Sequence, residues 1–274
     1  QSYTPTKDAD NDYTYTFKGW AVNGNTSNII KSTDIAVTAD VTYVAVFDKT
    51  ERKYTVTYYV DGKEYAKSEY AYGTQVTILP NAVRKGQTFS GWKIGNEVAK
   101  DFEIKSNVTI EGFFTQNTHQ YTINKHFYNE KDAEVKAAGK TETKTGNEYA
   151  LISELYKKDA VNQTVDEKTY DYVPGLTTVT DKLETLTKDV TIDLYYYLNV
   201  EGGNDIPDAW EYRLTFKVVN GSWNDGSSAD IVVYVPFKDK KTGEAFEAKN
   251  VVVPVTRIPL VGEKPNSGYH AGAW

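Results

Sequence analysis

Asn107-Val-Thr-Ile-Glu-Gly-Phe-Phe114 is the stretch that decides the fold, because the chain repeats it in related form. The other copies are Asp40-Val-Thr-Tyr-Val-Ala-Val-Phe47 and Asp189-Val-Thr-Ile-Asp-Leu-Tyr-Tyr196. Each copy opens with a turn-forming Asp or Asn, continues with Val-Thr and ends in an aromatic residue. Alternate residues of a strand share one face, so the apolar positions of each copy would line a core. The stretch therefore predicts a β-strand that closes a repeated unit.

A second motif lies upstream of the closing strand. Tyr15-Thr-Phe-Lys-Gly-Trp20 matches Gln87-Thr-Phe-Ser-Gly-Trp92, and Gly268-Tyr-His-Ala-Gly-Ala-Trp274 is a looser third copy. The Trp would fill a small core, and the Gly before it would allow a close backbone approach or an unusual φ. The residues expected in these cores are Trp20, Trp92, Phe17, Phe89, Gly91 and Trp274.

A third motif opens each unit. Tyr54-Thr-Val-Thr-Tyr-Tyr59 matches Tyr121-Thr-Ile-Asn-Lys-His126, and Leu214-Thr-Phe-Lys-Val-Val219 is similar to both. The chain is also rich in Tyr (22), Phe (10) and Trp (5), which suit a pleated, half-buried surface. Together these patterns predict a mainly β protein of the α+β kind, built from small modules in tandem.

The ordered motifs resemble a known family. Tyr54-Thr-Val-Thr-Tyr58, Gln87-Thr-Phe-Ser-Gly-Trp92 and Asn107-Val-Thr-Ile110 are similar to the Listeria–Bacteroides repeat, also called the internalin B-repeat. The resemblance covers residues 53–117 well, and residues 1–52 only in their second half. It implies β-grasp-like modules in an extended array, on a secreted protein of a bacterial cell surface.

The remaining segments extend this organisation. Residues 118–198 open and close like the repeat but lack Gly-Trp, and they resemble the mucin-binding-protein repeat. The predicted division of the chain is 1–52, the closing half of a module; 53–117, a complete repeat; 118–200, a longer mucin-binding-like repeat; and 201–274, a linker with the opening half of a further module.

Charge and motif content argue against several functions. The chain has 31 Lys and Arg against 38 Asp and Glu, a net charge of −7, which disfavours nucleic-acid binding. No apolar run approaches the roughly 20 residues of a membrane helix. There is no Cys, and His119, His126 and His270 lie without metal or catalytic spacing. We expect a protein that is not an enzyme and needs no cofactor.

The acidic segment around Glu201-Gly-Gly-Asn-Asp-Ile-Pro-Asp208 is where a metal could bind. Its Asp205 and Asp208 offer hard oxygen ligands for calcium, and the segment resembles the calcium linkers of surface proteins. It lacks the order of an EF-hand loop. The alternatives are a calcium site and a solvated turn, of which we favour the turn.

Two functions fit these features. The first is a non-catalytic stalk or adhesin module that contacts neighbouring repeats and host glycans or surface proteins. The second is a carbohydrate-binding accessory of a secreted glycan-degrading enzyme, because aromatic planes stack on sugar rings. Tyr195-Tyr196-Tyr197 cannot all face one side of a strand, so some of this aromatic surface would be exposed or shared between modules.

The two ends carry complementary half-modules. The N-terminal half has a closing strand without an opening one, and the C-terminal half the reverse. An unpaired strand edge is a template for another chain. Truncation of a longer array explains this, and head-to-tail self-association is the alternative.

Overall fold

The computed structural model describes residues 4–30, 38–201, 204–259 and 264–270. These residues form two compact units, 1–116 and 117–274. Strands dominate both, and the described residues contain one α-helix, so the predicted mainly β class is confirmed. The tandem division into four modules stays a prediction.

The first unit begins with a two-stranded ribbon. Strand β1 (Tyr13–Val22) pairs antiparallel with β2 (Tyr43–Glu51), and a bulge lies between Phe17 and Gly19. Gly19 has a φ of 155°, and a Cβ there would lie 2.5 Å from Ile29 Cγ2. The bulge therefore requires glycine at this position.

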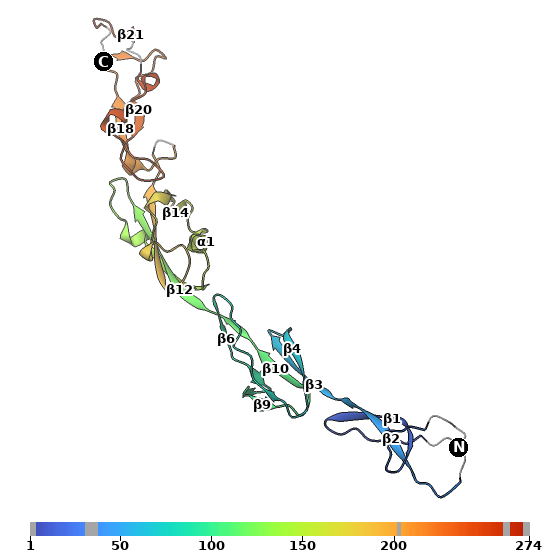
Figure 1. Ribbon diagram of the computed structural model, residues 1–274. Coiled ribbons are helices and arrows are strands. Elements are labelled where there is room, and N and C mark those ends of the chain that lie inside the picture. The colour runs from blue at the N-terminus through green and yellow to red at the C-terminus, as the bar shows by residue number, and fades with distance from the viewer. Residues whose placement is uncertain (1–3, 31–37, 202–203, 260–263, 271–274) are drawn as a thin grey trace. The chain divides into compact units, whose positions relative to one another are not determined.

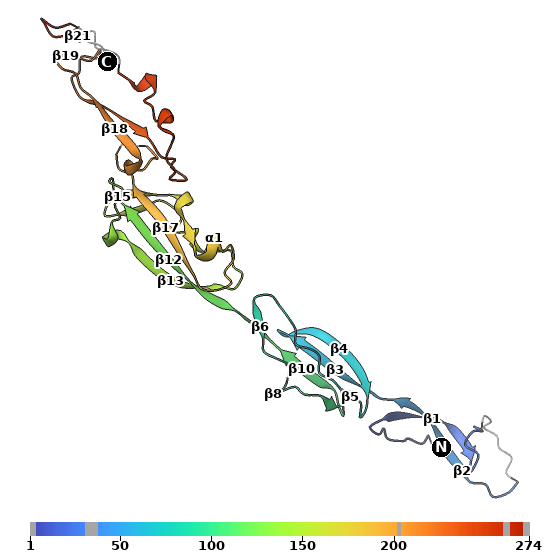
Figure 2. The same cartoon turned by 60° about the vertical axis from the view of Figure 1, so that its left-hand side comes forward.

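Residues 53–116 of the first unit form a complete sheet (Figures 1 and 2). Asp61 and Gly62, both with positive φ, form the two-residue turn that joins its opening hairpin. The closing strand pairs in parallel with the first strand of that hairpin. The five strands, in sheet order, are β4 (Lys63–Ala71), β3 (Lys53–Val60), β10 (Val108–Gly112), β7 (Lys93–Ile94) and β8 (Glu97–Val98).

Two short pairs complete this segment. They join β5 (Gln75–Val76) to β9 (Phe102–Glu103) and β6 (Gln87–Phe89) to β11 (Phe114–Gln116). One core lies under the sheet and contains Val56, Tyr58, Val76, Trp92, Ile104 and Ile110, each at most 4% exposed.

The second unit repeats this topology on a larger scale. A hairpin of β12 (Thr118–Tyr128) and β13 (Lys140–Asn147) again pairs in parallel, through β12, with the closing strand β17 (Val190–Leu198) (Figure 2). On the far side lie β15 (Lys168–Tyr172) and β14 (Gln163–Val165), and β16 (Thr178–Val179) also pairs with β17. Its core includes Ile123, Phe127, Ile152, Leu186, Ile192 and Tyr196.

Helices are few and short. Helix α1 (Ile152–Tyr156) packs Ile152 into this second core. The described 3-10 turns are Lys136–Ala138, Pro174–Leu176, Thr180–Lys182, Asp208–Trp210, Ala248–Asn250 and Val255–Arg257.

The second unit ends in two short pairs of antiparallel strands. Strand β18 (Glu211–Phe216) pairs antiparallel with β20 (Ile231–Pro236), and β19 (Gly221–Ser222) with β21 (Lys264–Pro265). Its buried apolar residues include Val233, Val235 and Trp223, each at most 8% exposed.

Candidate functional site

The two parallel strand pairs, β3 with β10 and β12 with β17, share one polar contact at their start. The side-chain oxygen Oδ1 of Asn107 accepts a hydrogen bond from the backbone N–H of Thr55 at 2.8 Å. Asp189 Oδ1 accepts from the N–H of Gln120, also at 2.8 Å. Val108 pairs with Val56, and Val190 with Tyr121, so the two bonds occupy the same position in each ladder. The contact explains why the closing motif opens with Asn or Asp.

Trp92 is the central side chain of the core of residues 53–116. It is 3% exposed, and its ring contacts Tyr58 and Phe89 edge-on, with centroids 5.0 and 4.9 Å away. Its indole Nε1–H donates to the carbonyl of Pro80 at 3.1 Å. A large apolar ring with one satisfied polar atom is suited to this position.

Glycine serves two different purposes around Phe89. Gly91 has a φ of 81°, a backbone conformation that favours glycine. A Cβ at this position would have no atom within 4 Å, so the requirement for glycine comes from the φ and not from a lack of space. Gly112 is the close approach, because a Cβ there would lie 2.1 Å from Phe89 Cζ. Gly112 lies inside the closing motif, but the motif alone does not indicate that glycine is required there.

The first copy of the Gly-Trp motif differs in burial. Trp20 is 39% exposed, so it is not a buried anchor as expected from its likeness to Trp92. The reason is that Trp92 is covered by Tyr58 of strand β3, whereas the ribbon around Trp20 has two strands. Phe17 still contacts Trp20 edge-on at 5.7 Å and Phe47 at 5.8 Å. Trp274 lies outside the described residues.

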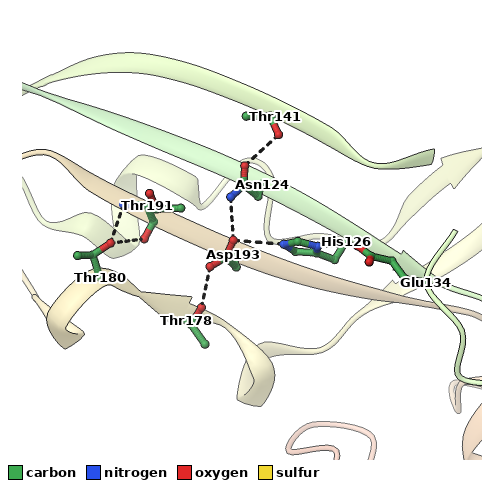
Figure 3. Close-up of polar contacts among 8 residues, drawn as sticks. All are labelled: Asn124, His126, Glu134, Thr141, Thr178, Thr180, Thr191 and Asp193. Atoms are coloured by element: carbon green, nitrogen blue, oxygen red, sulfur yellow. Dashed lines mark hydrogen bonds and ion pairs between the residues drawn. The ribbon is translucent and has the colours of Figure 1, made fainter. Parts of the chain in front are cut away.

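A polar network covers one face of β12 and β17 (Figure 3). His126 lies between two carboxylates, with Nδ1 2.8 Å from Glu134 Oε1 and Nε2 3.2 Å from Asp193 Oδ1. Asp193 also accepts from Asn124 Nδ2 at 2.9 Å and from the Thr178 hydroxyl at 3.0 Å. Both ring nitrogens of His126 are engaged, so neither is available to a substrate.

The network shifts two pKa values in opposite directions. Burial lowers the pKa of His126, but the hydrogen bonds to Glu134 and Asp193 outweigh it, and the net pKa is raised. Burial raises the pKa of Asp193, but hydrogen bonds from Asn124, His126 and Thr178 hold it below its usual value. An ion pair with shared donors favours charge on both partners.

This network was not found in the sequence. His126 and Asp193 are 67 positions apart and face each other only because β12 and β17 pair in parallel. The other two histidines are elsewhere. His119 Nδ1 lies 3.9 Å from Asp189, and His270 is exposed.

The acidic segment is held by contacts within the second unit. The Asp208 carboxylate accepts the backbone N–H groups of Val200, at 3.1 Å, and Glu201, at 3.0 Å, whereas Asp205 pairs with Lys240 at 3.1 Å. Across the part of the chain that the structure describes, no group of three or more His, Asp or Glu is placed to hold a metal ion. The two calcium candidates are thus held by different partners.

Trp210 joins this segment to the second sheet. It is 1% exposed and contacts Tyr197, with ring centroids 4.6 Å apart. Tyr197 in turn stacks on Tyr128 at 4.7 Å. Tyr196 points to the other side of β17 and stacks on Phe127 at 4.9 Å. The consecutive tyrosines therefore fill two apolar clusters on opposite faces, and burial raises the pKa of both Tyr196 and Tyr197.

A backbone contact completes this joint. The N–H of Gly175 donates to the carbonyl of Lys241 at 2.7 Å, and a Cβ on Gly175 would lie 2.6 Å from Thr242 Cα. Lys238 pairs with Asp132 at 3.1 Å. Residues 204–211, expected to form a linker, are therefore part of a packed contact between two segments of one unit.

No helix among the described residues is long and apolar enough to cross a membrane.

Comparisons with known proteins address the repeat motifs. No curated protein matches the chain. A solved structure of streptococcal SHIRT domains 3–4, described as from a cell surface protein, aligns with 14% identity and a TM-score of 0.22, covering 53% of this chain and 99% of that one. The family model described as the Listeria-Bacteroides repeat domain matches residues 54–115, which confirms the resemblance drawn from the motifs of that segment.

Proposed function

We propose that the chain is a non-catalytic repeat region of a secreted bacterial surface protein, and that its repeats carry tension. One observation supports this most. The chain enters each complete repeat on one strand and leaves it on the parallel neighbour: β3 and β10 in the first unit, β12 and β17 in the second.

This topology determines how a repeat responds to force. The start of one parallel strand and the end of its neighbour lie at opposite ends of their ladder. Tension applied through these ends therefore acts along the strands and loads all the ladder hydrogen bonds together. In an antiparallel hairpin pulled from its open end, the bonds would break one after another. The contacts at Thr55 and Gln120 add a bond at the entry end of each ladder.

The chemistry of the polar network is consistent with a structural role. His126 is held by two carboxylates and stacks on Tyr195, with ring centroids 5.1 Å apart. Such a network orients strands rather than a substrate. β-Grasp-like modules on a cell surface would need this mechanical role if they held a ligand-binding domain away from the cell.

Single-molecule force spectroscopy on the full chain, tethered at its ends, tests the proposal. We expect two high-force unfolding events, and the repeat of about sixty residues should release roughly 200 Å of chain. The matched control tethers the same protein through Cys introduced at Lys53 and Ala71, which are paired at the open end of the β3–β4 hairpin. That geometry should give a markedly lower force. Equal forces in the two geometries would contradict the proposal.

A second candidate is carbohydrate binding, favoured by one partly exposed aromatic pair. Tyr212 is 56% exposed and lies 4.6 Å from Phe237, with ring planes 31° apart. Such rings could stack on the apolar face of a sugar. A glycan array probed with the chain and with Tyr212→Ala tests this, since signals lost in the variant would support it. An array without signals, or with signals equal for both proteins, would exclude this pair as a sugar site.

A further inference from the structure

A pocket of about 490 Å³ lies on one face of the antiparallel pair of β18 and β20, within the second unit. In the register of these strands Glu211 lies opposite Pro236, and Tyr234 is two residues before Pro236, so the three side chains share one face. The volume is within the usual range of small-molecule sites. The wall of the pocket includes Asn204, Ile206, Glu211, Tyr234, Pro236 and Arg257.

Glu211 is the buried charged group of this pocket. Among the described residues, Glu211 and Asp171 are the two charged side chains that are buried, at 8% and 9% exposed. Asp171 accepts one hydrogen bond on each oxygen, from Asn162 and Asn199, both at 2.6 Å. In the same described ranges, the two oxygens of Glu211 share a single donor, Asn204 Nδ2, at 3.1 and 3.4 Å. A carboxylate has about four lone-pair positions, so Glu211 brings unused acceptor positions to the pocket wall.

The charges around Glu211 increase its need for donors. Burial raises the pKa of its carboxyl, and the hydrogen bond from Asn204 opposes that rise. The negative charges of Asp208 and Glu201 raise the pKa further, Arg257 lowers it, and the net pKa is above the ordinary value. A ligand that donates hydrogen bonds to Glu211 would stabilise its ionised form.

The polar groups of the wall are held in place by other contacts. The backbone carbonyl of Asn204 accepts from Asn199 Nδ2, and its side-chain Oδ1 accepts from the N–H of Ile206, both at 2.8 Å. The Tyr234 hydroxyl donates to Glu201 Oε2 at 2.8 Å. Side chains that are already fixed lose little entropy when a ligand binds, so the site is preorganised.

The hydrogen-bonding chemistry of the wall selects the class of ligand. Ionised Glu211 only accepts, Arg257 only donates, and the Asn204 amide does both. A hydroxyl group donates and accepts, so a ligand with several hydroxyls suits all three. An ammonium ligand would bring a charge of the same sign as Arg257. An anionic ligand would meet the acidic groups around Glu211, in a chain whose net charge is −7.

The remaining wall is apolar. Val232, Ile206 and Pro236 line the same pocket and are half-buried. A pyranose ring has hydroxyls along its edge and an apolar face of C–H groups, and so combines the two properties that this wall requires.

We propose that this pocket binds a neutral pyranose sugar. Its hydroxyls donate to the Glu211 carboxylate, and the C–H face of its ring lies against Pro236 and Ile206. The site is separate from the Tyr212–Phe237 pair, because Tyr212 lies opposite Val235 and projects from the other face of the strands. It is also independent of the mechanical role, which rests on the parallel ladders.

Saturation-transfer NMR on the full chain tests the proposal with glucose, galactose, mannose and N-acetylglucosamine at roughly millimolar concentrations. We expect a signal from at least one of them. Glu211→Gln keeps the side-chain shape but removes the charge, and should weaken binding roughly tenfold or more, the effect of a hydrogen bond to a charged group. Glu244→Gln changes an exposed carboxylate of the same unit, and this matched control should bind like the parent chain.

Two further measurements separate binding from folding. Glu211→Gln should not lower the melting temperature, because it removes a buried charge that has few partners. Val232→Trp should fill the pocket and abolish binding while Glu211 is unchanged. Glucosamine, which is a cation, and glucuronic acid, which is an anion, should both bind more weakly than the neutral sugars.

The inference has clear contrary outcomes. No signal from the four neutral sugars, equal binding by Glu211→Gln and the parent chain, or tighter binding of either charged sugar would overturn it. Signals lost in Tyr212→Ala but kept in Glu211→Gln would assign the sugar to the aromatic pair and would also overturn it. None of these results changes the unfolding forces expected for the repeats, so the two proposals fail separately.

Discussion

The side-chain oxygen of Asn107 holds the backbone N–H of Thr55 at 2.8 Å, across 52 positions of the chain. Asp189 and Gln120 reproduce the contact across 69 positions. Asn and Asp are expected here as turn-forming residues. In both units, this residue also fixes the start of a parallel pair of strands.

Removing this contact should weaken the first unit. We expect Asn107→Ala to lower the free energy of unfolding by about 1 kcal/mol, the usual net value of one hydrogen bond. Asn107→Asp keeps an acceptor oxygen and should be near neutral. Urea denaturation measures both, with the exposed neighbour Lys105→Ala as control. If Lys105→Ala lowered the free energy of unfolding as much as Asn107→Ala, the hydrogen bond of Asn107 would not be a specific source of stability.

Replacing Trp92 or Trp20 of the Gly-Trp motif by alanine should lower the free energy of unfolding by different amounts. Trp92→Ala removes a buried ring and should cost about 3–5 kcal/mol of unfolding free energy. Trp20→Ala should cost well under half of that, because the Trp20 side chain is already 39% exposed. Equilibrium denaturation compares the pair. A loss below about 1 kcal/mol for Trp92→Ala would show that the motif is a surface feature.

Trp210 should couple the stability of the sheet that contains β17 to the stability of residues 204–259. Trp210→Ala leaves a cavity against Tyr197, with a cost of about 3–5 kcal/mol. Trp210→Phe should cost less, because the buried indole Nε1 has no hydrogen-bond partner among the residues that the structure describes. Hydrogen exchange should show faster exchange in both β17 and β20 of the alanine variant. Faster exchange confined to residues 204–259 would contradict the coupling.

The polar network predicts a dependence of stability on pH. The raised pKa of His126 means that its contribution is present below the unfolded value of about 6.5 and lost as pH rises through the folded pKa. The lowered pKa of Asp193 means that its contribution is present above about 3.9 and lost as pH falls through the folded pKa. Both contributions are present at about pH 5–6.

Melting curves at several pH values check this pair. His126→Gln should lose most stability near pH 5.5, relative to the parent chain, and the loss should shrink as pH rises through the folded pKa of His126. His119→Gln is the control. A loss that is independent of pH would show that the charge on His126 contributes nothing.

Chelation tests the acidic segment. We expect EDTA to leave the melting temperature unchanged, since Asp208 binds backbone N–H groups and Asp205 binds Lys240. A fall of several degrees, restored by calcium, would instead make Asp205 and Asp208 ligands.

Motif spacing predicted the mainly β class and the segment that matches the repeat family, because apolar alternation and Gly-Trp are local patterns. It could not predict which strands are neighbours. The parallel pairing of β12 with β17 brings His126 to Asp193. The sequence of neither strand indicates that the other is its neighbour. The same holds for Gly112, whose constraint comes from a ring 23 positions away.

Trp210 also escaped the sequence analysis, for a different reason. Its neighbours are Asp, Pro and Asn, which favour turns, and the segment was therefore expected to be solvated. The Trp210 ring and the Asp208 carboxylate are among the groups that hold this segment, through Tyr197 and the backbone N–H of Glu201.

The burial of Trp210 has a consequence for cleavage. Proteases attack exposed, mobile connections between domains, because the backbone must enter their active sites in extended form. The stretch Ile206–Glu211 is docked by Trp210, and its Ile206 packs into the same cluster. Next to it stands Arg213, a residue that trypsin-like enzymes recognise, in strand β18. The second unit should therefore resist digestion by trypsin-like enzymes at Arg213, and limited proteolysis of Trp210→Ala should show faster cleavage there.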